Sequence, residues 1–341
     1  MGSTYGRQIK VSIFGESHGA AIGVVVDGLP AGLPVNEESI NAFLQRRAPG
    51  QSKMTTPRKE KDKPIFLSGV KDGFSCGTPL AAIIENENTR SVDYDNLKEV
   101  PRPGHGDFTG MVKYGAFADL AGGGHFSGRL TAPLCIAGAI FKDVLQLIGV
   151  EIVCTVVEIG GCKEEPYAEI EKARLDLDSV GGIVKCTVKG LPAGVGDPMF
   201  DGLEGRISQA VFAIPAVKAI EFGSGFDGCK VRGSENNDPF MVDENTGQVV
   251  TKTNNCGGIL GGISTGGEIE FKVGFKPTPS IGKAQQSVNV KTNQVVELKV
   301  KGRHDPCIVP RALPCVEAAT ALALIDSIDL SMLLGQNEKQ L

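Results

Sequence analysis

The stretch Ile22-Gly-Val-Val-Val-Asp-Gly-Leu-Pro-Ala-Gly32 has a close counterpart later in the chain, Ile183-Val-Lys-Cys-Thr-Val-Lys-Gly-Leu-Pro-Ala-Gly194. Each starts with β-branched residues typical of a strand and ends in Gly-Leu-Pro-Ala-Gly, which favours a turn. Such a turn could recur by chance in a chain with 45 glycines. The alternative is an internal repeat with halves at about 1–150 and 151–341. We prefer the repeat, with both halves sharing one core in a single domain (1–341), because no Pro/Ser-rich linker separates them.

Hydrophobic periodicity around these two stretches predicts a mixture of strands and helices. Period-two or β-branched runs indicate strands at 9–14, 22–27, 80–85, 151–159, 183–189, 268–275 and 295–300. Helical patterns cover about 37–47, 129–148, 203–220 and 312–334. Because strands and helices do not alternate strictly, we expect an α+β fold rather than a doubly wound sheet.

Composition excludes several classes of protein. The 341 residues include 35 Lys and Arg against 40 Asp and Glu, and a net charge of −5 argues against a nucleic-acid partner, which would need a basic face. Hydrophobic residues make up 41% and charged residues 22%, as in ordinary soluble proteins. The most apolar long segment, 315–334, contains Glu317, Asp326 and Asp329, so we expect no membrane span.

Cysteine and histidine usage indicates the cellular compartment. Nine cysteines are scattered along the chain and never spaced as Cys-x-x-Cys, which favours a reducing environment in which thiols act as small apolar side chains. The start of the sequence has no secretory signal pattern. We therefore expect a cytoplasmic protein, and with four histidines we expect no His/Cys metal cluster.

A basic segment interrupts the regular patterns. Residues 48–64 contain few apolar side chains, so we expect a loop or lid. Between Arg46 and Lys63 there are seven basic and two acidic residues. This run is either a solvated charged surface or a flap that captures an anion, since Arg46 and Arg47 at a helix end can present forked donors to phosphate or carboxylate.

All four histidines lie in polar, glycine-flanked sequence. His18 follows a strand, His105 lies in Arg102-Pro-Gly-His-Gly-Asp107, His125 follows three glycines, and His304 precedes Asp305. Any one of them could be a hydrogen-bonded structural histidine, but as a set they are natural proton donors near neutral pH.

Two glycine-rich loops and a Lys/Thr/Ser segment add anion-binding potential. Residues 121–129 lead into a helix as a phosphate-binding turn does, and 255–262 and 275–280 are either tight turns or further ligand loops. No serine stands in Gly-x-Ser-x-Gly, and no carboxylate cluster resembles a cation site. A site rich in Arg, Lys, His and Gly suits a small polyanionic substrate whose phosphate could leave.

These segments together resemble the chorismate synthase family over nearly the whole chain. The resemblance rests on seven ordered motifs: Gly15-Glu-Ser-His-Gly19 with the following Asp-Gly-Leu-Pro-Ala-Gly, Arg46-Arg-Ala-Pro-Gly50, Arg102-Pro-Gly-His105, Gly122 to Arg129, Gly257-Gly-Ile-Leu-Gly-Gly262, Lys276-Pro-Thr278 and Gly302-Arg-His-Asp-Pro-Cys307.

The resemblance implies a lyase of the shikimate pathway. Members of the family eliminate phosphate from 5-enolpyruvylshikimate 3-phosphate in an anti-1,4 sense to give chorismate. They need reduced FMN although there is no net redox change, and they are usually homotetramers with a β-α-β sandwich fold. We expect the same here, with NADPH serving only indirectly as a source of reducing equivalents.

The resemblance also implies roles for individual residues. His18 would protonate the departing phosphate, His105 would protonate or polarise the reduced flavin, and Asp305 would assist proton handling near the flavin. The expected substrate contacts are Arg46, Arg47, Lys53, Arg102, Arg129 and Arg303. The expected flavin contacts are His125, Phe126, Ser127, Pro215, Ala216, Gly261, Lys276, Pro277, Thr278, Pro279, Ser280 and Arg303.

Some positions depart from the family's commoner pattern. His125-Phe-Ser-Gly-Arg129 replaces a frequent Arg-Ser-Ser-Ala-Arg, Pro215-Ala216 replaces Asn-Ala, and Lys53 replaces an Arg. Phe126 cannot supply a serine hydroxyl, and Lys53 keeps the charge without the fork. Two other functions stay open from the sequence: a flavin- or phosphate-binding module without turnover, and a flavin oxidoreductase that uses NADPH.

Overall fold

Alternating burial along the strands builds two antiparallel sheets. The structure is a computed structural model that describes residues 2–48, 50, 62–86, 99–300 and 304–334. The strands of the first sheet lie in the order β1 (Thr4–Tyr5), β2 (Lys10–Gly15), β3 (Ala21–Asp27), β7 (Leu80–Glu85) and β4 (Ile65–Ser68). Those of the second lie in the order β10 (Val217–Phe222), β15 (Ile269–Phe275), β9 (Gly182–Lys189) and β8 (Glu151–Ile159).

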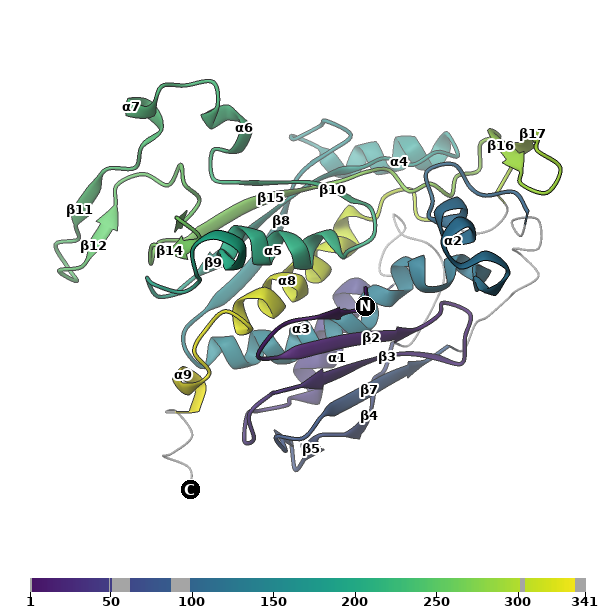
Figure 1. The fold of residues 1–341 in the computed structure, drawn as a ribbon. Helices are drawn as coiled ribbons and strands as arrows, with labels where there is room; N and C mark the ends of the chain where they lie inside the picture. The colour runs from purple at the N-terminus through teal and green to yellow at the C-terminus, as the bar shows by residue number, and fades with distance from the viewer. Residues whose placement is uncertain (1, 49, 51–61, 87–98, 301–303, 335–341) are drawn as a thin grey trace.

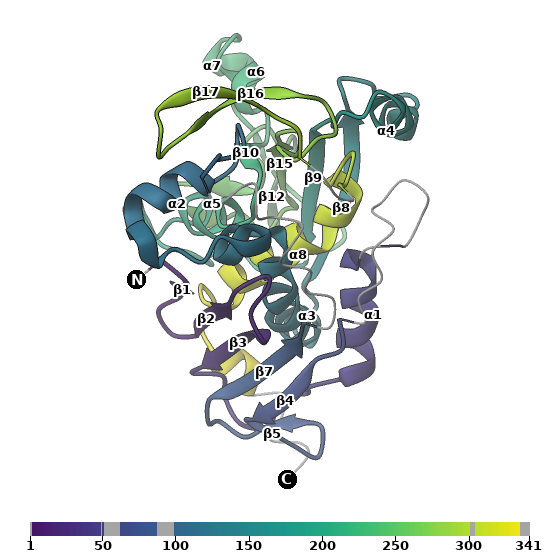
Figure 2. The same cartoon turned by 90° about the vertical axis from the view of Figure 1, so that its right-hand side faces the viewer.

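Four helices occupy the space between the sheets (Figures 1 and 2). They are α1 (Glu37–Arg47), α3 (Thr131–Gln146), α5 (Leu203–Phe212) and α8 (Val309–Ile325). Helix α3 packs on β2, β3 and β7 of the first sheet, whereas α8 packs on β8 and β9 of the second. Both helices are apolar on nearly all sides, as expected for helices enclosed in a core.

The two long helices touch each other along a glycine. A Cβ atom placed on Gly138 of α3 would lie 2.2 Å from Cβ of Ala318 in α8, so only glycine allows this approach of the backbones. One turn earlier, Cys135 of α3 meets Cys315 of α8. Because the contacts advance in the same direction on both helices, α3 and α8 run parallel and begin at the same end of the molecule.

Two buried carboxylates fasten other elements to α8. Glu317 accepts hydrogen bonds from Arg46, Lys142 and the backbone N–H of Cys154, and it thereby holds α1, α3 and β8. Asp326, directly after α8, accepts from the backbone N–H groups of residues 7–9 and pairs with Arg206 of α5. Each carboxylate has several donors, which compensates for its burial.

The two Gly-Leu-Pro-Ala-Gly turns are closed in the same way. After β3, Ser75 Oγ donates to Pro30 O at 2.6 Å and accepts from Leu33 N at 3.0 Å. After β9, Ser264 Oγ donates to Pro192 O at 2.6 Å and accepts from Val195 N at 2.9 Å. In each case the turn is followed by a helix that enters the central layer, α1 and α5 respectively.

The remaining elements are strands, helices and 3₁₀ turns outside the two large sheets and the four central helices. They are β5 (Val70–Lys71), β6 (Phe74–Ser75), α2 (Asp107–Tyr114), α4 (Pro166–Leu175), α6 (Gly225–Gly228), α7 (Gly233–Asn236), β11 (Phe240–Val242), β12 (Val249–Thr251), β13 (Ile259–Leu260), β14 (Ile263–Ser264), β16 (Gln285–Asn289), β17 (Gln294–Leu298), α9 (Ser331–Leu334) and the 3₁₀ turns η2 (Gly115–Phe117), η3 (Ala121–Phe126), η4 (Gly128–Leu130) and η5 (Met199–Asp201). The arm that carries α6, α7, β11 and β12 projects away from the sheets (Figure 1). In the described part of the chain, no helix is long and apolar enough to cross a membrane.

The mixed α and β content confirms the predicted fold class, and most elements lie where the sequence places them. The seven predicted strands match β2, β3, β7, β8, β9, β15 and β17 to within two residues at either end. The helix predicted over 203–220 is wrong beyond Phe212: residues 217–222 form β10. Pro215 lacks a backbone donor and Ala216 has a φ of 73°, so the helix cannot continue there. The helix predicted over 312–334 begins earlier, at Val309, and ends at Ile325.

The close approach of α3 and α8 gives a test that compares two helical glycines. Gly138→Ala should destabilise the protein by about 1–3 kcal/mol, because the added methyl forces the helices apart. Gly205→Ala, on the exposed face of α5 with its nearest neighbour 3.7 Å away, should instead stabilise by about 0.5–1 kcal/mol through helix propensity. Denaturation midpoints measure both, and a stabilising Gly138→Ala would contradict the packing described.

Candidate active site

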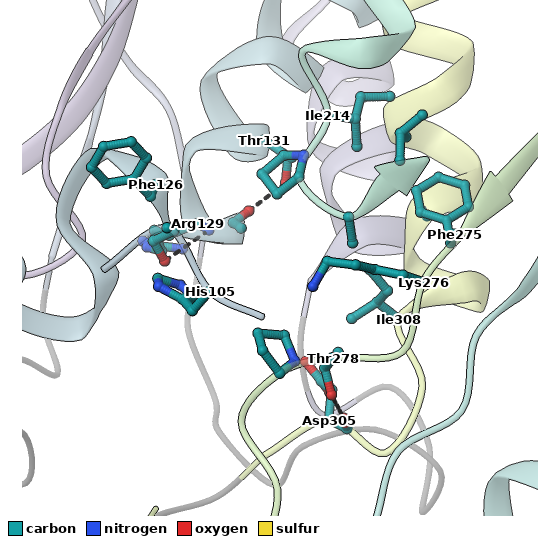
Figure 3. A pocket seen from close by; sticks show the side chains of 18 of the residues that line it. His105, Phe126, Arg129, Thr131, Ile214, Phe275, Lys276, Thr278, Asp305 and Ile308 are labelled. Atoms are coloured by element: carbon teal, nitrogen blue, oxygen red, sulfur yellow. Dashed lines mark hydrogen bonds between the residues drawn. The ribbon is translucent and has the colours of Figure 1, made fainter. Parts of the chain in front are cut away.

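A cavity of about 620 Å³ opens at the end of the molecule where α3 and α8 begin. Its lining comes from the starts of these helices, from the residues after α5, from the loop after β15 and from the loop before α2. Figure 3 shows His105 and Arg129 on one side and Lys276, Phe275 and Ile308 on the other. Segments that are far apart in sequence therefore meet at one place.

The cavity is strongly cationic. The described basic residues that line it are Arg47, Arg102, Arg129, Lys218, Lys276 and Arg311, and Asp305 is the acidic one. The positive ends of two helix dipoles, those of α3 and α8, also meet here. Burial and the nearby Lys218 lower the pKa of Lys276. This arrangement favours an anionic ligand with more than one charged group.

Arg47 and Arg129 share a buried carboxylate. Asp62 Oδ2 lies 2.5 Å from Arg47 Nη2, and its Oδ1 pairs with Arg129. Burial alone would raise the pKa of Asp62, but the two guanidinium groups outweigh it and lower that pKa overall. The Nε of Arg47 is buried and has no hydrogen-bond partner among the described residues. The two arginines are thus arranged to hold an anion with two oxygens. The Nε–H of Arg47 is one further donor without a partner among the described residues.

His105 is held by a second carboxylate. Its Nδ1 lies 2.6 Å from Asp107 Oδ1, and Asp107 also receives Nε and Nη2 of Arg102 at 2.7 and 2.8 Å. Burial raises the pKa of Asp107, but Arg102 and His105 lower it further, to well below its usual range. A carboxylate at Nδ1 favours the tautomer with the proton on that nitrogen, so Nε2, which lies 3.3 Å from Arg102 Nη2, is the nitrogen that can accept a proton.

The three consecutive glycines pack against both catalytic candidates. Gly122 and Gly123 have positive φ values, and a Cβ on Gly122 would lie 2.5 Å from the His18 ring. A Cβ on Gly123 would come within 3.3 Å of the His105 ring. The glycine segment predicted as an anion loop therefore packs against both His18 and His105 through adjacent residues. Larger residues would push both rings away.

The residues after the glycines have structural partners of their own. His125 Nδ1 lies 2.8 Å from Gly15 O and its Nε2 lies 2.8 Å from Ser3 Oγ. Phe126 lies against Gly106 and Gly110 of the α2 region, where added Cβ atoms would fall 3.2 and 2.9 Å from its ring. The glycines on α2 thus provide room for the aromatic ring that departs from the common pattern.

The far wall of the cavity joins the loops after β15 and before α8. Thr278 Oγ1 donates to Asp305 O at 2.9 Å, and Lys276 Nζ donates to Gly104 O at 2.8 Å. Asp305 Oδ2 lies 2.5 Å from Arg311 Nη1, while Arg311 Nε donates to Arg47 O at 2.9 Å. Asp305 is therefore tied to the same guanidinium network that holds the other side of the cavity.

The structure brings most of the predicted site residues together. Those that line the cavity are Arg47, Arg102, His105, His125, Phe126, Ser127, Arg129, Pro215, Ala216, Lys276, Thr278, Pro279, Ser280 and Asp305. His18 lies next to the lining at Gly122, and Pro277 lies between two lining residues. Lys53 and Arg303, and most of the predicted 48–64 loop, lie outside the described residues.

Two predicted residues lie elsewhere. Arg46 points to Glu317 on α8, with two hydrogen bonds of 2.7 and 2.8 Å, instead of into the cavity. Gly261 lies in the turn between β13 and β14, next to Gly262, which accepts from the first residue of α5. The cavity is at the other end of α5, about 15 Å away for a ten-residue helix.

Several residues of this site are not among the predicted ones. Asp62 and Asp107 are buried partners of cavity arginines, and Arg311 and Cys315 lie on the cavity-facing side of α8. Asp107 stands two residues after His105, a spacing that the sequence does display. Asp62 belongs to a run of charged residues, and nothing in the sequence distinguishes it from the others.

Comparisons with known proteins show the family of the chain. The family model described as chorismate synthase matches residues 9–328. The chain is 48% identical to a chorismate synthase from Lachnoclostridium phytofermentans, covering 95% of this chain and 94% of the relative. It is 44% identical to one from Korarchaeum cryptofilum, covering 97% and 98%. A crystal structure of a chorismate synthase superposes with a TM-score of 0.76 at 25% identity, over 98% of both chains. The chain therefore belongs to the chorismate synthase family.

Proposed function

We propose that the chain is a carbon–oxygen lyase that eliminates phosphate from 5-enolpyruvylshikimate 3-phosphate to give chorismate, with reduced FMN and without net redox change. The observation that carries this proposal is the cationic cavity in which Arg47 and Arg129 already share one carboxylate. The substrate bears a phosphate and two carboxylates, so its charge suits this cavity. A phosphate dianion leaves more easily where fixed cations take up its charge.

His18 and His105, which both pack against the glycine segment, are placed to handle protons. In a 1,4-elimination a proton and the leaving group depart from opposite ends of a four-carbon unit. We assign protonation of the leaving phosphate to His18 and proton exchange with the flavin to His105, whose tautomer Asp107 sets. Asp305, held by Arg311, would assist from the far wall. Arg47, Arg102 and Arg129 would orient the substrate.

The residues of the cavity fit a flavin as well as the substrate. The cavity has a volume of about 620 Å³, which lies within the usual range for ligand pockets of about 300–1,000 Å³. Ile214, Phe275 and Ile308 form an apolar wall (Figure 3), suited to a flat ring system, and Lys276 and the 278–280 segment offer polar contacts beside it. When bound, reduced FMN supplies the electron density that eases loss of phosphate. Because the Phe126 ring packs against α2, contacts of residues 125–127 with the flavin would come from backbone atoms.

We also propose the family's reductant requirement, homotetrameric assembly, cytoplasmic location and β-α-β sandwich with two related halves. An external reductant is expected, and NADPH consumption by the pure protein with FMN would contradict this.

The projecting arm exposes apolar side chains, including Phe240 and Val249, which are 68% and 65% exposed and suit burial against another copy. All nine cysteines are free, as in a reducing compartment. The matching Ser75 and Ser264 contacts support duplicated halves within a single domain.

Loss of either histidine should abolish most turnover. With anaerobic protein, chemically reduced FMN and 5-enolpyruvylshikimate 3-phosphate, His18→Ala and His105→Ala should each slow phosphate and chorismate formation by about 10²–10⁴-fold. Flavin binding should persist in both variants. Full turnover in both would favour another role for the site, and a wild-type protein that binds flavin without turnover would be a binding module.

Two adjacent arginines offer a matched test of the substrate site. Arg47→Gln should weaken binding of 5-enolpyruvylshikimate 3-phosphate by about 10–100-fold, since hydrogen bonds to charged groups are worth about 1.5–3 kcal/mol. FMN binding should change much less. Arg46→Gln, which removes a partner of Glu317, should lower the melting temperature and leave substrate affinity within about twofold. Equal losses of substrate and FMN binding in Arg47→Gln would refute the assignment.

Asp107 should act through His105. Asp107→Asn should lower kcat by about 10–100-fold with a smaller change in KM, because His105 loses the partner that fixes its tautomer. In a double-mutant cycle, adding Asp107→Asn to His105→Ala should cost little further activity. Additive losses in the double variant would mean that Asp107 contributes independently, as a purely structural partner of Arg102.

A further inference from the structure

Two thiols meet where the parallel helices α3 and α8 enter the cavity. Cys135 Sγ and Cys315 Sγ are 3.9 Å apart, each in the second turn of its helix. Both residues are buried from bulk solvent, yet Cys315 is part of the cavity lining. Cys315, which is 3% exposed, is therefore the thiol of the pair that lies at the cavity wall, and the fully buried Cys135 lies behind it.

The surroundings of Cys315 favour its thiolate. Cys135 donates its S–H toward Cys315, and the guanidinium groups of Arg47 and Arg311 lie nearby. These interactions, the hydrogen bond from Cys135 foremost, lower the pKa of Cys315, whereas burial raises the pKa of Cys135. A thiolate in a cationic, accessible pocket is the reactive form of cysteine, and a neighbouring thiol can resolve its oxidation product.

We propose that Cys315 is a peroxide-reactive thiol of the cavity and that Cys135 resolves it to a reversible disulfide between α8 and α3. The Cys315 thiolate attacks hydrogen peroxide, the O–O bond breaks, and the products are a sulfenic acid and, after uptake of a proton, water. The Cys135 sulfur then attacks the sulfenic sulfur and displaces hydroxide, which takes the thiol proton to give a second water. Overall, two thiols and one peroxide give one disulfide and two waters.

The cross-link changes the cavity as well as the thiols. The two sulfur atoms must approach from 3.9 Å to about 2.05 Å, so the helix ends must shift or the side chains rotate. Arg47 is held at these helix ends, through Thr131 of α3 at 3.3 Å and Arg311 of α8 at 2.9 Å. Oxidation therefore disturbs a guanidinium group that we assign to the substrate, and this functional effect rests on the proposed function.

Another buried pair provides an internal comparison. Cys154 and Cys186 lie opposite each other on β8 and β9. Neither belongs to the cavity lining, and burial raises the pKa of Cys154. Cys76 and Cys229 are exposed and stand apart from the cavity lining. The proposal therefore requires oxidation to begin at Cys315 rather than at the more exposed thiols.

Peptide mapping tests the proposal without relying on activity. The reduced full-length protein is treated with a small excess of hydrogen peroxide, blocked with N-ethylmaleimide under denaturing conditions, and digested for mass spectrometry. We expect a peptide joining Cys135 to Cys315, with Cys154 and Cys186 still blocked as thiols, and full reversal by dithiothreitol. Cys135→Ser should give a dimedone adduct on Cys315 in place of the cross-link. Cys315→Ser should leave Cys135 reduced.

Two outcomes would overturn the proposal. One is a wild-type protein in which Cys315 stays reduced while Cys76 or Cys229 is oxidised. The other is a Cys315→Ser variant in which Cys135 oxidises at the wild-type rate. Elimination activity, measured in parallel, should fall with the time course of the cross-link and recover with dithiothreitol. Full activity in cross-linked protein would reject the functional effect, whereas inactivity of the fully reduced protein would instead reject the proposed function.

Discussion

The contact between Gly138 and Ala318 is the constraint on which the rest of the structure depends. It lets two long apolar helices run in parallel with their backbones nearly touching, one packed on each sheet. Because they are parallel and begin at the same end, their amide ends and positive dipoles open into the same space. An anion site at that end follows from the packing before any charged side chain is considered. Antiparallel helices in the same position would have cancelled this effect.

The arginines of the cavity are held in place by buried acids. A guanidinium group that lies out of water needs a partner, and Asp62, Asp107 and Asp305 serve Arg47, Arg102 and Arg311 in this way. Each acid also fixes the direction in which its arginine points. The guanidinium groups therefore stay around the cavity instead of turning toward bulk water. The cavity keeps an excess of positive charge because its acids are fewer than its basic residues.

Much of this could be predicted from the sequence, and the failures have physical causes. Period-two hydrophobic patterns located the strands, and the ordered motifs contain about half of the residues that line the cavity. Arg46 and Arg47 could not be told apart, because adjacent helical residues point about 100° apart and only the packing of α1 decides which faces α8 and which the cavity. The end of α5 was missed because the hydrophobic pattern continues into β10, while Pro215 and the positive φ of Ala216 turn the chain.

The position of the site between α3 and α8 also explains why its chemistry is divided along the chain. Residues before 150 supply the two histidines that pack against the glycine segment and the Arg47–Asp62–Arg129 cluster, whereas later residues supply Lys276, Asp305 and Arg311. The turns after β3 and β9 have the same hydrogen bonds, yet the loops that reach the cavity differ in length and composition. The parallel helices α3 and α8 fix where the two sets of loops meet, and the differences between those loops make the cavity asymmetric. An asymmetric substrate needs that asymmetry, because its phosphate must lie beside one set of groups and its transferred proton beside another.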